Sequence, residues 1–291
     1  MKVLKFGGTS VGSAQRIKNV AALVLAAQTM SAQRLIVRMD DIGASHSENL
    51  AVIKCYQEGI GRSAEVMSVC PWFMEASKML NENPGLDVGV HIALRSEWVG
   101  YKWRPITNCP TLCDEDGFLN LNFGGNFDIK EAEAEMRAQI ELAMKYVKNV
   151  THITDHCMWT MLPGMHELAV KVAESYGLRY QGQASEDEAI GIYNLPMGFG
   201  GQGSYTDRLL EAIKKLEKGK TYWTIEHPAL DNEEMKGIYE LGRDGKPTDV
   251  GKQRQAVTDA FTSPEIMKYI KDNGIELVSF GDVMREKGVI K

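Results

Sequence analysis

The sequence has no hydrophobic run long enough to cross a bilayer. Its longest apolar run covers residues 20–27, about half of the length that a transmembrane helix needs. It also has no basic stretch interleaved with aromatic residues, and its 33 lysines and arginines are outnumbered by 39 aspartates and glutamates, giving a net charge of -6. We therefore expect neither a membrane nor a nucleic acid as a partner.

Cysteine is scarce as well, with five residues and no spacing typical of a disulfide framework. Such a pattern favours free, mostly buried thiols. Cys109 and Cys113 could form a bridge if the protein is exported, although two cysteines this close more often share a loop. Of the 291 residues, 44% are hydrophobic and 25% are charged, which is typical of a globular protein with a sizeable core. A disordered tail, a collagen-like chain and a disulfide-dense mini-protein are excluded.

The first 33 residues differ from the rest of the chain. Residues 1–6 are expected to form a short strand, followed by a glycine turn and a helix at 13–27. Residues 2–11 closely resemble the opening of aspartate kinases, whose Lys-Phe-Gly-Gly-Thr-Ser loop approaches nucleotide phosphates. The resemblance ends near residue 30, and none of the kinase's later segments follow. We interpret residues 1–33 as a fused leader and residues 34–291 as a separate domain.

A second interpretation concerns the end of this leader. The apolar run at residues 20–27 and the small residues near Ala32 fit the core and the cleavage site of a secretory signal, whereas the preceding Phe-Gly-Gly-Thr-Ser segment does not. We expect a cytoplasmic protein. The alternative is a periplasmic or secreted one, if residues 20–33 are the remnant of a signal.

From Arg34 onward, short apolar strands alternate with amphipathic helices. The expected strands are residues 35–39, 64–69, 86–92, 149–153, 178–181, 221–225 and 275–280. The expected helices are residues 47–58, 71–80, 128–148, 166–176, 206–216 and a last one that Ser263 caps and Gly274 follows. Repeated strand–helix units predict a parallel sheet covered by helices. About seven units in this length favour an α/β fold of the distorted (β/α) barrel type, similar to a TIM barrel.

Polar residues follow four of the predicted strands at the point where each strand ends. They are Asp40 with Asp41, His91, His156 and His227. Because the carboxyl ends of parallel strands meet at one edge, we expect these side chains to converge. A carboxylate and two imidazoles can hold a divalent ion while leaving positions open for water and substrate, and the remaining groups could form an acid/base pair.

Each of these residues also has a simpler interpretation. Adjacent aspartates at a strand end often belong to a solvated loop or cap a helix, and His91 could be a hydrogen-bonded core histidine. His152 points away from the strand-end site and receives no role, while His46 and His166 are expected in a loop or at a helix start. The ligand interpretation depends on the equivalent positions of the four strand ends.

Five segments resemble the YdjC-like carbohydrate deacetylases, in the same order and at similar spacing. They are residues 35–45, with a strand ending in Asp-Asp-Ile-Gly; residues 88–94, with a Gly-Val-His segment; residues 151–163, with Thr-His-Ile-Thr-Asp-His; Glu226-His227-Pro228; and the helix and strand within residues 256–283. The likeness covers residues 34–291.

This resemblance implies a barrel of the polysaccharide deacetylase type and metal-dependent removal of an N-acetyl group from an amino sugar. Asp41, His91 and His156 would bind one divalent ion, either Mg²⁺ or Zn²⁺. Asp40 would act as general base on the metal-activated water, and His227 would protonate the departing amine.

The sequence departs from the family pattern at two places. Cys157, Met158 and Trp159 stand where further histidines are often found, which puts sugar specificity and the orientation of His156 in doubt. Arg38 and Met39 replace the smaller residues that are common before the aspartates.

The segment after His91 is rich in aromatic residues. Trp98, Trp103 and Arg104 are predicted to bind the sugar, since aromatic faces beside a polar site suit sugar rings. The alternative is a loop that packs its aromatic rings on the barrel. The glycine-rich residues 198–203 are expected to form a flexible loop near the mouth of the barrel, and they lack the context of a dinucleotide site.

Two other functions remain open for the sequence. The same barrel could bind a metal and a sugar without catalysis, although a binder would not need Asp40 and His227. The chain could also be a nucleotide-dependent aspartate kinase fragment, but the absence of the kinase's later segments counts against this interpretation. The expected partner is a small carbohydrate, and a homo-oligomer is possible.

Overall fold

The structure is a computed structural model that describes residues 13–19, 32–121, 126–197 and 203–290. The predicted strand at residues 1–6, the glycine turn after it and most of the predicted loop at residues 198–203 lie outside the described residues. Within the described part, no helix combines the length and the apolar character that spanning a bilayer would require.

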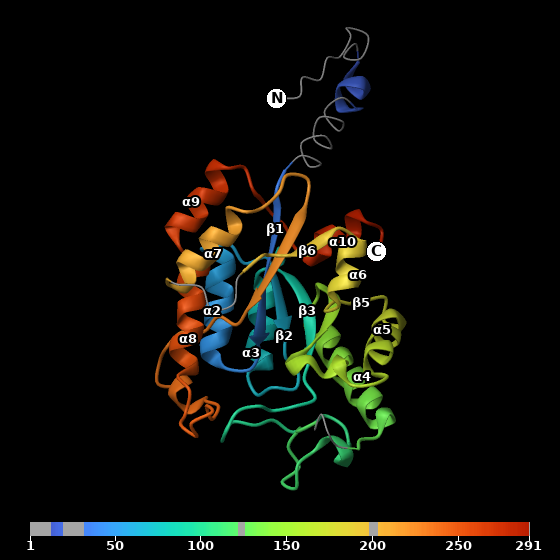
Figure 1. The fold of residues 1–291 in the computed structure, drawn as a ribbon. Coiled ribbons are helices and arrows are strands. Elements are labelled where there is room, and N and C mark those ends of the chain that lie inside the picture. Colours follow the sequence, from blue (N-terminus) through green and yellow to red (C-terminus); the bar gives the residue numbers. More distant parts are fainter. Residues whose placement is uncertain (1–12, 20–31, 122–125, 198–202, 291) are drawn as a thin grey trace.

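Parallel strands form one curved sheet in the middle of the molecule (Figure 1). The strands are β1 (Arg34–Ile42), β2 (Ser63–Val66), β3 (Asp87–Ile92), β4 (Val150–Asp155), β5 (Arg179–Tyr180), β6 (Ile192–Asn194), β7 (Thr221–Glu226) and β8 (Glu276–Leu277). Their order is β5-β4-β3-β2-β1-β7-β6, and β8 pairs with the start of β1. This is the cyclic order of a barrel left open between β5 and β6, so the predicted distorted barrel is confirmed.

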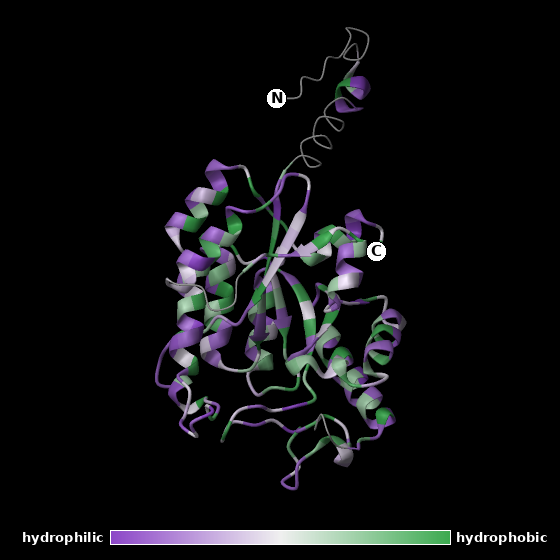
Figure 2. Cartoon of the chain, viewed as in Figure 1, coloured by the Kyte–Doolittle hydropathy of each residue, from purple (hydrophilic) through white to green (hydrophobic). Residues whose placement is uncertain are grey.

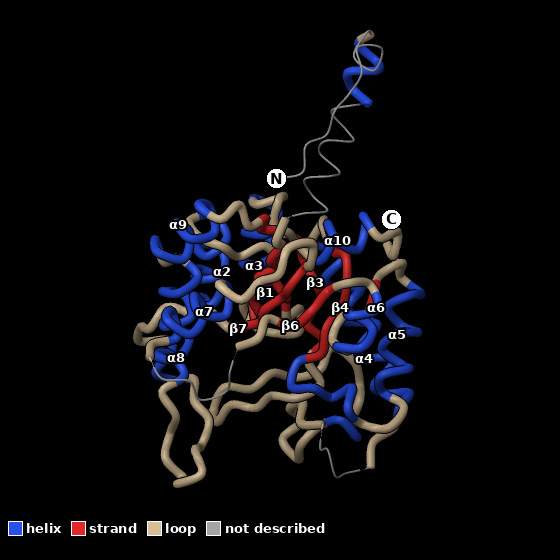
Figure 3. Tube along the Cα trace, turned by 45° about the horizontal axis from the view of Figure 1, so that its top comes forward, coloured by secondary structure: helices blue, strands red, loops and turns tan. Residues whose placement is uncertain are grey.

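Helices cover the outside of this sheet (Figure 3). They are α2 (His46–Gln57), α3 (Phe73–Glu82), α4 (Ile129–Tyr146), α5 (Met165–Ser175), α6 (Ala184–Ala189), α7 (Tyr205–Ile213), α8 (Val250–Phe261), α9 (Pro264–Asp272) and α10 (Phe280–Glu286). The predicted caps are present: Asp128 accepts a hydrogen bond from the Lys130 amide, and Ser263 precedes Pro264 at the first position of α9.

The sequence pattern missed β6, α6, α8 and α10. Three residues of β6 are too few to show a period-two pattern. At the end of the chain the prediction of a strand to residue 280 was too long. Ser279 and Asp282 form a reciprocal capping box there, so the chain turns helical at Phe280.

Alternating residues of β1 face two different hydrophobic clusters. Leu35, Val37 and Met39 belong to the large core between the strands and the outer helices, and Figure 2 shows apolar residues along the strands and on the helices that cover them. Ile36 belongs to a smaller cluster with residues of α10. The Phe280 amide donates to Ser63 Oγ, at the start of β2, so α10 closes the amino-terminal end of the barrel.

The smaller cluster, which contains Ile36, Phe280, Val283 and Met284, forms an apolar plug at this end of the barrel. Above the plug, the positions of four adjacent strands that face the interior carry polar side chains or glycine. They are Arg38 and Asp40 on β1, Ser63 and Glu65 on β2, Asp87, Gly89 and His91 on β3, and His152 and Thr154 on β4. TIM barrels usually fill this space with branched apolar side chains. Here a buried, charged layer separates the apolar plug from the carboxyl ends of the strands.

Phe280→Ala tests the apolar plug. The ring is fully buried, 5.5 Å from the His152 ring centroid and 5.6 Å from that of Trp223. We expect the free energy of unfolding to fall by about 3–5 kcal/mol, because the deletion leaves a cavity. Urea denaturation measures the change, with the half-exposed Phe118→Ala as the control. A smaller loss for Phe280 than for Phe118 would contradict the plug.

Candidate functional site

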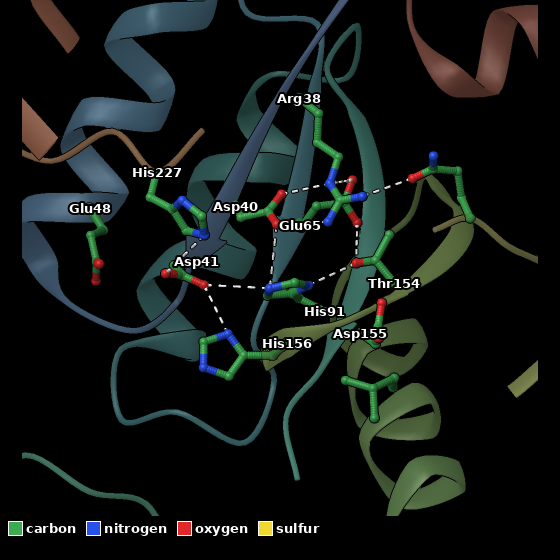
Figure 4. Close-up of polar contacts among 12 residues, drawn as sticks. Arg38, Asp40, Asp41, Glu48, Glu65, His91, Thr154, Asp155, His156 and His227 are labelled. Carbon is green, nitrogen blue, oxygen red and sulfur yellow. Dashed lines mark hydrogen bonds and ion pairs between the residues drawn. The ribbon is translucent and has the colours of Figure 1, made fainter. Parts of the chain in front are cut away.

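Two adjacent aspartates at the end of β1 face the same cavity. Asp40 follows the alternation of the strand and points inward like Arg38. Asp41 would point outward in a regular strand, but its φ of 73° and the register shift between Met39 and Ile42 turn its carboxylate inward (Figure 4). The left-handed conformation is one that aspartate adopts more readily than most residues. A local bulge therefore places both carboxylates at one site.

Two histidines from other strands converge on Asp41. His91 Nε2 lies 3.5 Å from Asp41 Oδ1, and His156 Nδ1 lies 3.3 Å from the same oxygen. His91 comes from β3, and His156 begins the short helix η3 (His156–Met161) directly after β4. One ligand atom from each of the three residues lies within 4.8 Å of the others. The predicted ligand set is thus brought together in one buried cluster.

The chemistry of this cluster fits a divalent ion. Both carboxylate oxygens of Asp41 are buried and, among the described residues, have ion-pair partners, with Arg254 Nη2 2.8 Å from Oδ2, but no hydrogen bond of good geometry. The outer ring nitrogens are already occupied: His91 Nδ1 lies 2.8 Å from Thr154 Oγ1, and His156 Nε2 lies 2.7 Å from Glu97 Oε2. The remaining nitrogen of each ring faces Asp41. Metal-binding histidines are usually oriented in this way by a partner on the far nitrogen.

Glu97 and burial act on the two histidines differently. Burial would lower the pKa of His156, but the nearby Glu97 carboxylate outweighs it and raises that pKa well above its ordinary value. Burial lowers the pKa of His91, which favours the neutral ring that a metal needs. An ion held at His156 Nδ1 would require that nitrogen to be free of its proton, so metal binding would be coupled to proton release.

Arg254 of α8 completes the surroundings of Asp41, and the sequence analysis missed it. Its Nη2 lies 2.8 Å from Asp41 Oδ2, and its Nη1 pairs with the buried Glu48 of α2. Burial alone would raise the pKa of Asp41, but Arg254 and His227 lower it well below the ordinary value. Burial raises the pKa of Glu48 to about 7. A single arginine within a polar helix carries no sequence signal for this contact.

Arg38 has the corresponding role at Asp40. Its Nε and Nη2 donate to the two oxygens of Asp40, each at 2.7 Å, and its Nη1 donates to Gln181 at 2.8 Å. Burial opposes the positive charge, but Asp40 and Glu65 raise the pKa of Arg38 above its ordinary value. A bidentate ion pair of this kind fixes the orientation of the carboxylate. The departure from the family pattern at residue 38 therefore has a structural consequence.

His227 follows β7 and borders the same cavity, which has a volume of about 510 Å³. Its Nε2 lies 4.0 Å from Asp41 Oδ2, and its side chain is 38% exposed. Asp40, Asp41, His91 and His156 line the cavity as well. The five residues predicted to converge thus border one space at the carboxyl ends of the strands.

The predicted sugar-binding residues do not line this cavity. Trp98 and Trp103 are each 2% exposed, and their rings pack against the Arg254 guanidinium and the His156 ring respectively. Arg104 stacks over Phe118 at 4.6 Å and donates to the Gly117 carbonyl. The alternative of a loop packing its aromatic rings on the barrel describes this segment. Neither indole ring faces the cavity that contains Asp41, and Arg104 does not line it either, so we do not carry these three residues into the proposed function.

Other residues form the cavity wall instead. Trp223 and Ile225 of β7 line it. They pair with Ile36 and Arg38 of β1, which face inward. Their alternation along the strand is the sequence signal that could have identified them. Cys157 and Met158 also line the cavity, with left-handed φ angles of 61° and 53°. All five cysteines are free, Cys109 and Cys113 included.

Comparison with known proteins gives relatives over most of the chain. The family described as YdjC-like protein matches residues 34–272. A carbohydrate deacetylase of Thermoanaerobacter pseudethanolicus is 26% identical over 255 residues, which cover 84% of this chain and 97% of that protein. Another, of Brevibacillus brevis, is 28% identical over 263 residues, covering 86% and 99% respectively.

A solved structure shares the fold. It is the crystal structure of an Enterococcus faecalis protein named for cellobiose-phosphate cleavage, which superposes with a TM-score of 0.71 at 21% sequence identity. The superposition covers 87% of this chain and 99% of that chain.

We expect His91→Ala and His156→Ala each to abolish tight binding of Zn²⁺ or Mg²⁺ while the fold persists, because each removes one of the three predicted ligands. Calorimetric titration measures the affinity and circular dichroism the fold. His46→Ala is the matched control, since His46 contacts Glu75 away from the cluster. Full metal occupancy in either site variant would refute the ligand assignment.

Proposed function

The chain belongs to the YdjC-like protein family, and on this premise we propose that it is a metal-dependent deacetylase that removes the N-acetyl group from an amino sugar or oligosaccharide. The observation that carries the proposal is the cluster of Asp41, His91 and His156 in one cavity with Asp40 and His227. Relatives named carbohydrate deacetylases align with this chain over almost their whole length, which supports the same reaction.

Asp41, His91 and His156 would hold one divalent ion. When bound, such an ion polarises the amide carbonyl and lowers the pKa of its water. Two imidazoles suit Zn²⁺, whereas the carboxylate also suits Mg²⁺, so both ions belong in the test. Arg254 and the two histidines hold the Asp41 carboxylate from different sides, which fixes the position of the ligand oxygens.

Asp40 is the proposed general base. Its Oδ2 lies 3.5 Å from His91 Nε2, so it borders the ligand cluster without belonging to it. Arg38 occupies one lone-pair direction on each Asp40 oxygen and leaves others facing the cavity. Asp40 therefore accepts a proton from the attacking water in a fixed orientation.

His227 is the proposed general acid. It stands on a different strand from Asp40 and is the most exposed of the five converging residues. An imidazole suits protonation of a departing amine near neutral pH.

Trp223 and Ile225 give the cavity an apolar wall that suits the face of a sugar ring. The free thiols agree with the proposed cytoplasmic location.

Replacing the acid and the base separates a deacetylase from a non-catalytic binding barrel. We expect Asp40→Asn and His227→Ala to retain the metal and the substrate affinity, while turnover falls by roughly 10²–10⁴ for each. The measurement is acetate release from an N-acetylated oligosaccharide. The rate of the unaltered protein should have a bell-shaped pH profile that loses its acidic limb in Asp40→Asn and changes its basic limb in His227→Ala.

His46→Ala serves as the control for these variants, because it lies outside the cavity. Unchanged turnover with a lowered melting temperature would mean that Asp40 only caps the turn after β1 and that His227 only packs beside Pro228. That outcome would end the acid/base assignment.

We also propose that the leader is dispensable, since every residue of the proposed site follows Arg34. The Ala32 carbonyl accepts a hydrogen bond from the Gly219 amide, and the Gln33 carbonyl accepts one from the Glu276 amide. A truncation should therefore remove residues 1–31 and keep these two. We expect its turnover per metal site to equal that of the full chain. A folded truncation that has lost turnover would show that the leader belongs to the enzyme.

A further inference from the structure

Glu65 and His152 meet inside the barrel across a glycine. The register places Glu65 of β2 beside Gly89 of β3, and Gly89 beside His152 of β4. A Cβ atom at Gly89 would lie 2.0 Å from Glu65 Oε2 and 2.6 Å from His152 Nε2. Because that side chain is missing, His152 Nε2 approaches Glu65 Oε1 to 2.8 Å. The glycine thus allows a contact between two strands that are not neighbours.

In the charged layer, the hydrogen bonds of Asp87 and Thr151 determine whether His152 Nδ1 carries a proton. The Asp87 carboxylate accepts three hydrogen bonds. They come from Ser63 Oγ at 2.9 Å, the Gly281 amide at 2.9 Å and Thr151 Oγ1 at 2.7 Å. The single hydroxyl proton of Thr151 is used in its bond to Asp87. Thr151 Oγ1 can therefore only accept from His152 Nδ1, which lies 2.8 Å away.

The hydrogen bonds of Glu65 and Thr154 determine the proton on His152 Nε2 and the one on His91 Nδ1. Arg38 Nε, 3.8 Å from Glu65 Oε1, favours the ionised carboxylate, whose oxygens can only accept. His152 Nε2 therefore donates to Glu65 Oε1, and His152 donates from both ring nitrogens. Glu65 Oε2 accepts from the Thr154 hydroxyl at 2.9 Å. Thr154 Oγ1 must then accept from His91 Nδ1 at 2.8 Å, so His91 carries a proton on Nδ1 and turns Nε2 toward Asp41.

We propose that His152 is a buried imidazolium that acts through Glu65 and Thr154 to keep the ring proton of His91 on Nδ1, so that Nε2 is presented to the metal. His152 is a positioning residue, because Glu65 and Thr154 separate it from His91. The statement about the metal rests on the proposed function, whereas the ring protons do not.

The groups that face His152 favour its positive charge. Glu65 of β2 and Asp87 of β3 are negative, and Arg38 of β1 is the charge that opposes it. The Phe280 ring of α10 covers the remaining side. Burial alone would lower the pKa of His152, but Glu65 and Asp87 outweigh burial and raise it. A buried cation held between two carboxylates costs less than one left unpaired.

Nitrogen NMR of the full chain with ¹⁵N-labelled histidine tests the proton pattern directly. We expect His152 to stay doubly protonated at neutral pH, above the ordinary histidine pKa of about 6.5, because Glu65 and Asp87 raise its pKa. His91 should carry its proton on Nδ1. Single His→Gln variants assign the signals. A neutral His152 near pH 7, or a His91 ring without a proton on Nδ1, would overturn the proposal whether or not the protein deacetylates a sugar.

Conservative variants test the chain of contacts through Zn²⁺ affinity. Thr154→Val keeps the shape but removes the hydroxyl, and we expect affinity to fall by roughly 10–100-fold, whereas Thr154→Ser should bind like the unaltered protein. Gly89→Ala should also weaken binding, with Gly237→Ala as control because its Cβ meets nothing within 4 Å. Equal affinity and an equal His91 tautomer in Thr154→Val would overturn the proposal. Loss of Zn²⁺ binding in the unaltered protein would instead count against the proposed function.

Discussion

Charges buried inside the barrel must be paired, and this requirement organises the centre of the molecule. Arg38 lies between Asp40 and Glu65, and His152 lies between Glu65 and Asp87. An unpaired ion in such a place costs several kcal/mol even after relaxation. Each side chain therefore has little freedom to turn away from its partner. The orientation of the groups at the mouth of the barrel follows from contacts made well below it.

The two adjacent aspartates show how this pairing separates their roles. Carboxylates so close together would repel each other and would not both ionise easily. Arg38, two residues before Asp40, holds one of them, and Arg254 of α8 holds the other. Asp40 is engaged at both oxygens by one guanidinium, whereas Asp41 faces two imidazole nitrogens as well. This difference supports the proposed roles, proton transfer by Asp40 and metal binding by Asp41.

The barrel is layered along its axis, and the layers have different tasks. The α10 helix closes one end with apolar side chains, the charged layer fills the middle, and the cavity opens at the other end. If apolar side chains filled the middle of the barrel, as in an ordinary TIM barrel, His91 Nδ1 would have no hydrogen-bond partner. Gly89 is what lets the charged layer cross from β2 to β4, since any side chain there would occupy the space of the Glu65–His152 pair.

The sequence by itself determined the alternation of strands and helices, and with it the barrel and the meeting of Asp40, Asp41, His91, His156 and His227 at one end. Local hydrophobic periodicity and strand polarity are enough for this, because parallel strands must end at the same edge. Only the tertiary structure decided that Trp98 and Trp103 are buried, that Arg254 reaches Asp41, and that His152 has a charged partner. These contacts depend on strand register and on how distant segments pack, which residue spacing along one chain does not encode. Two residues on β2 and β4 become neighbours only because a third strand between them carries no side chain at that point.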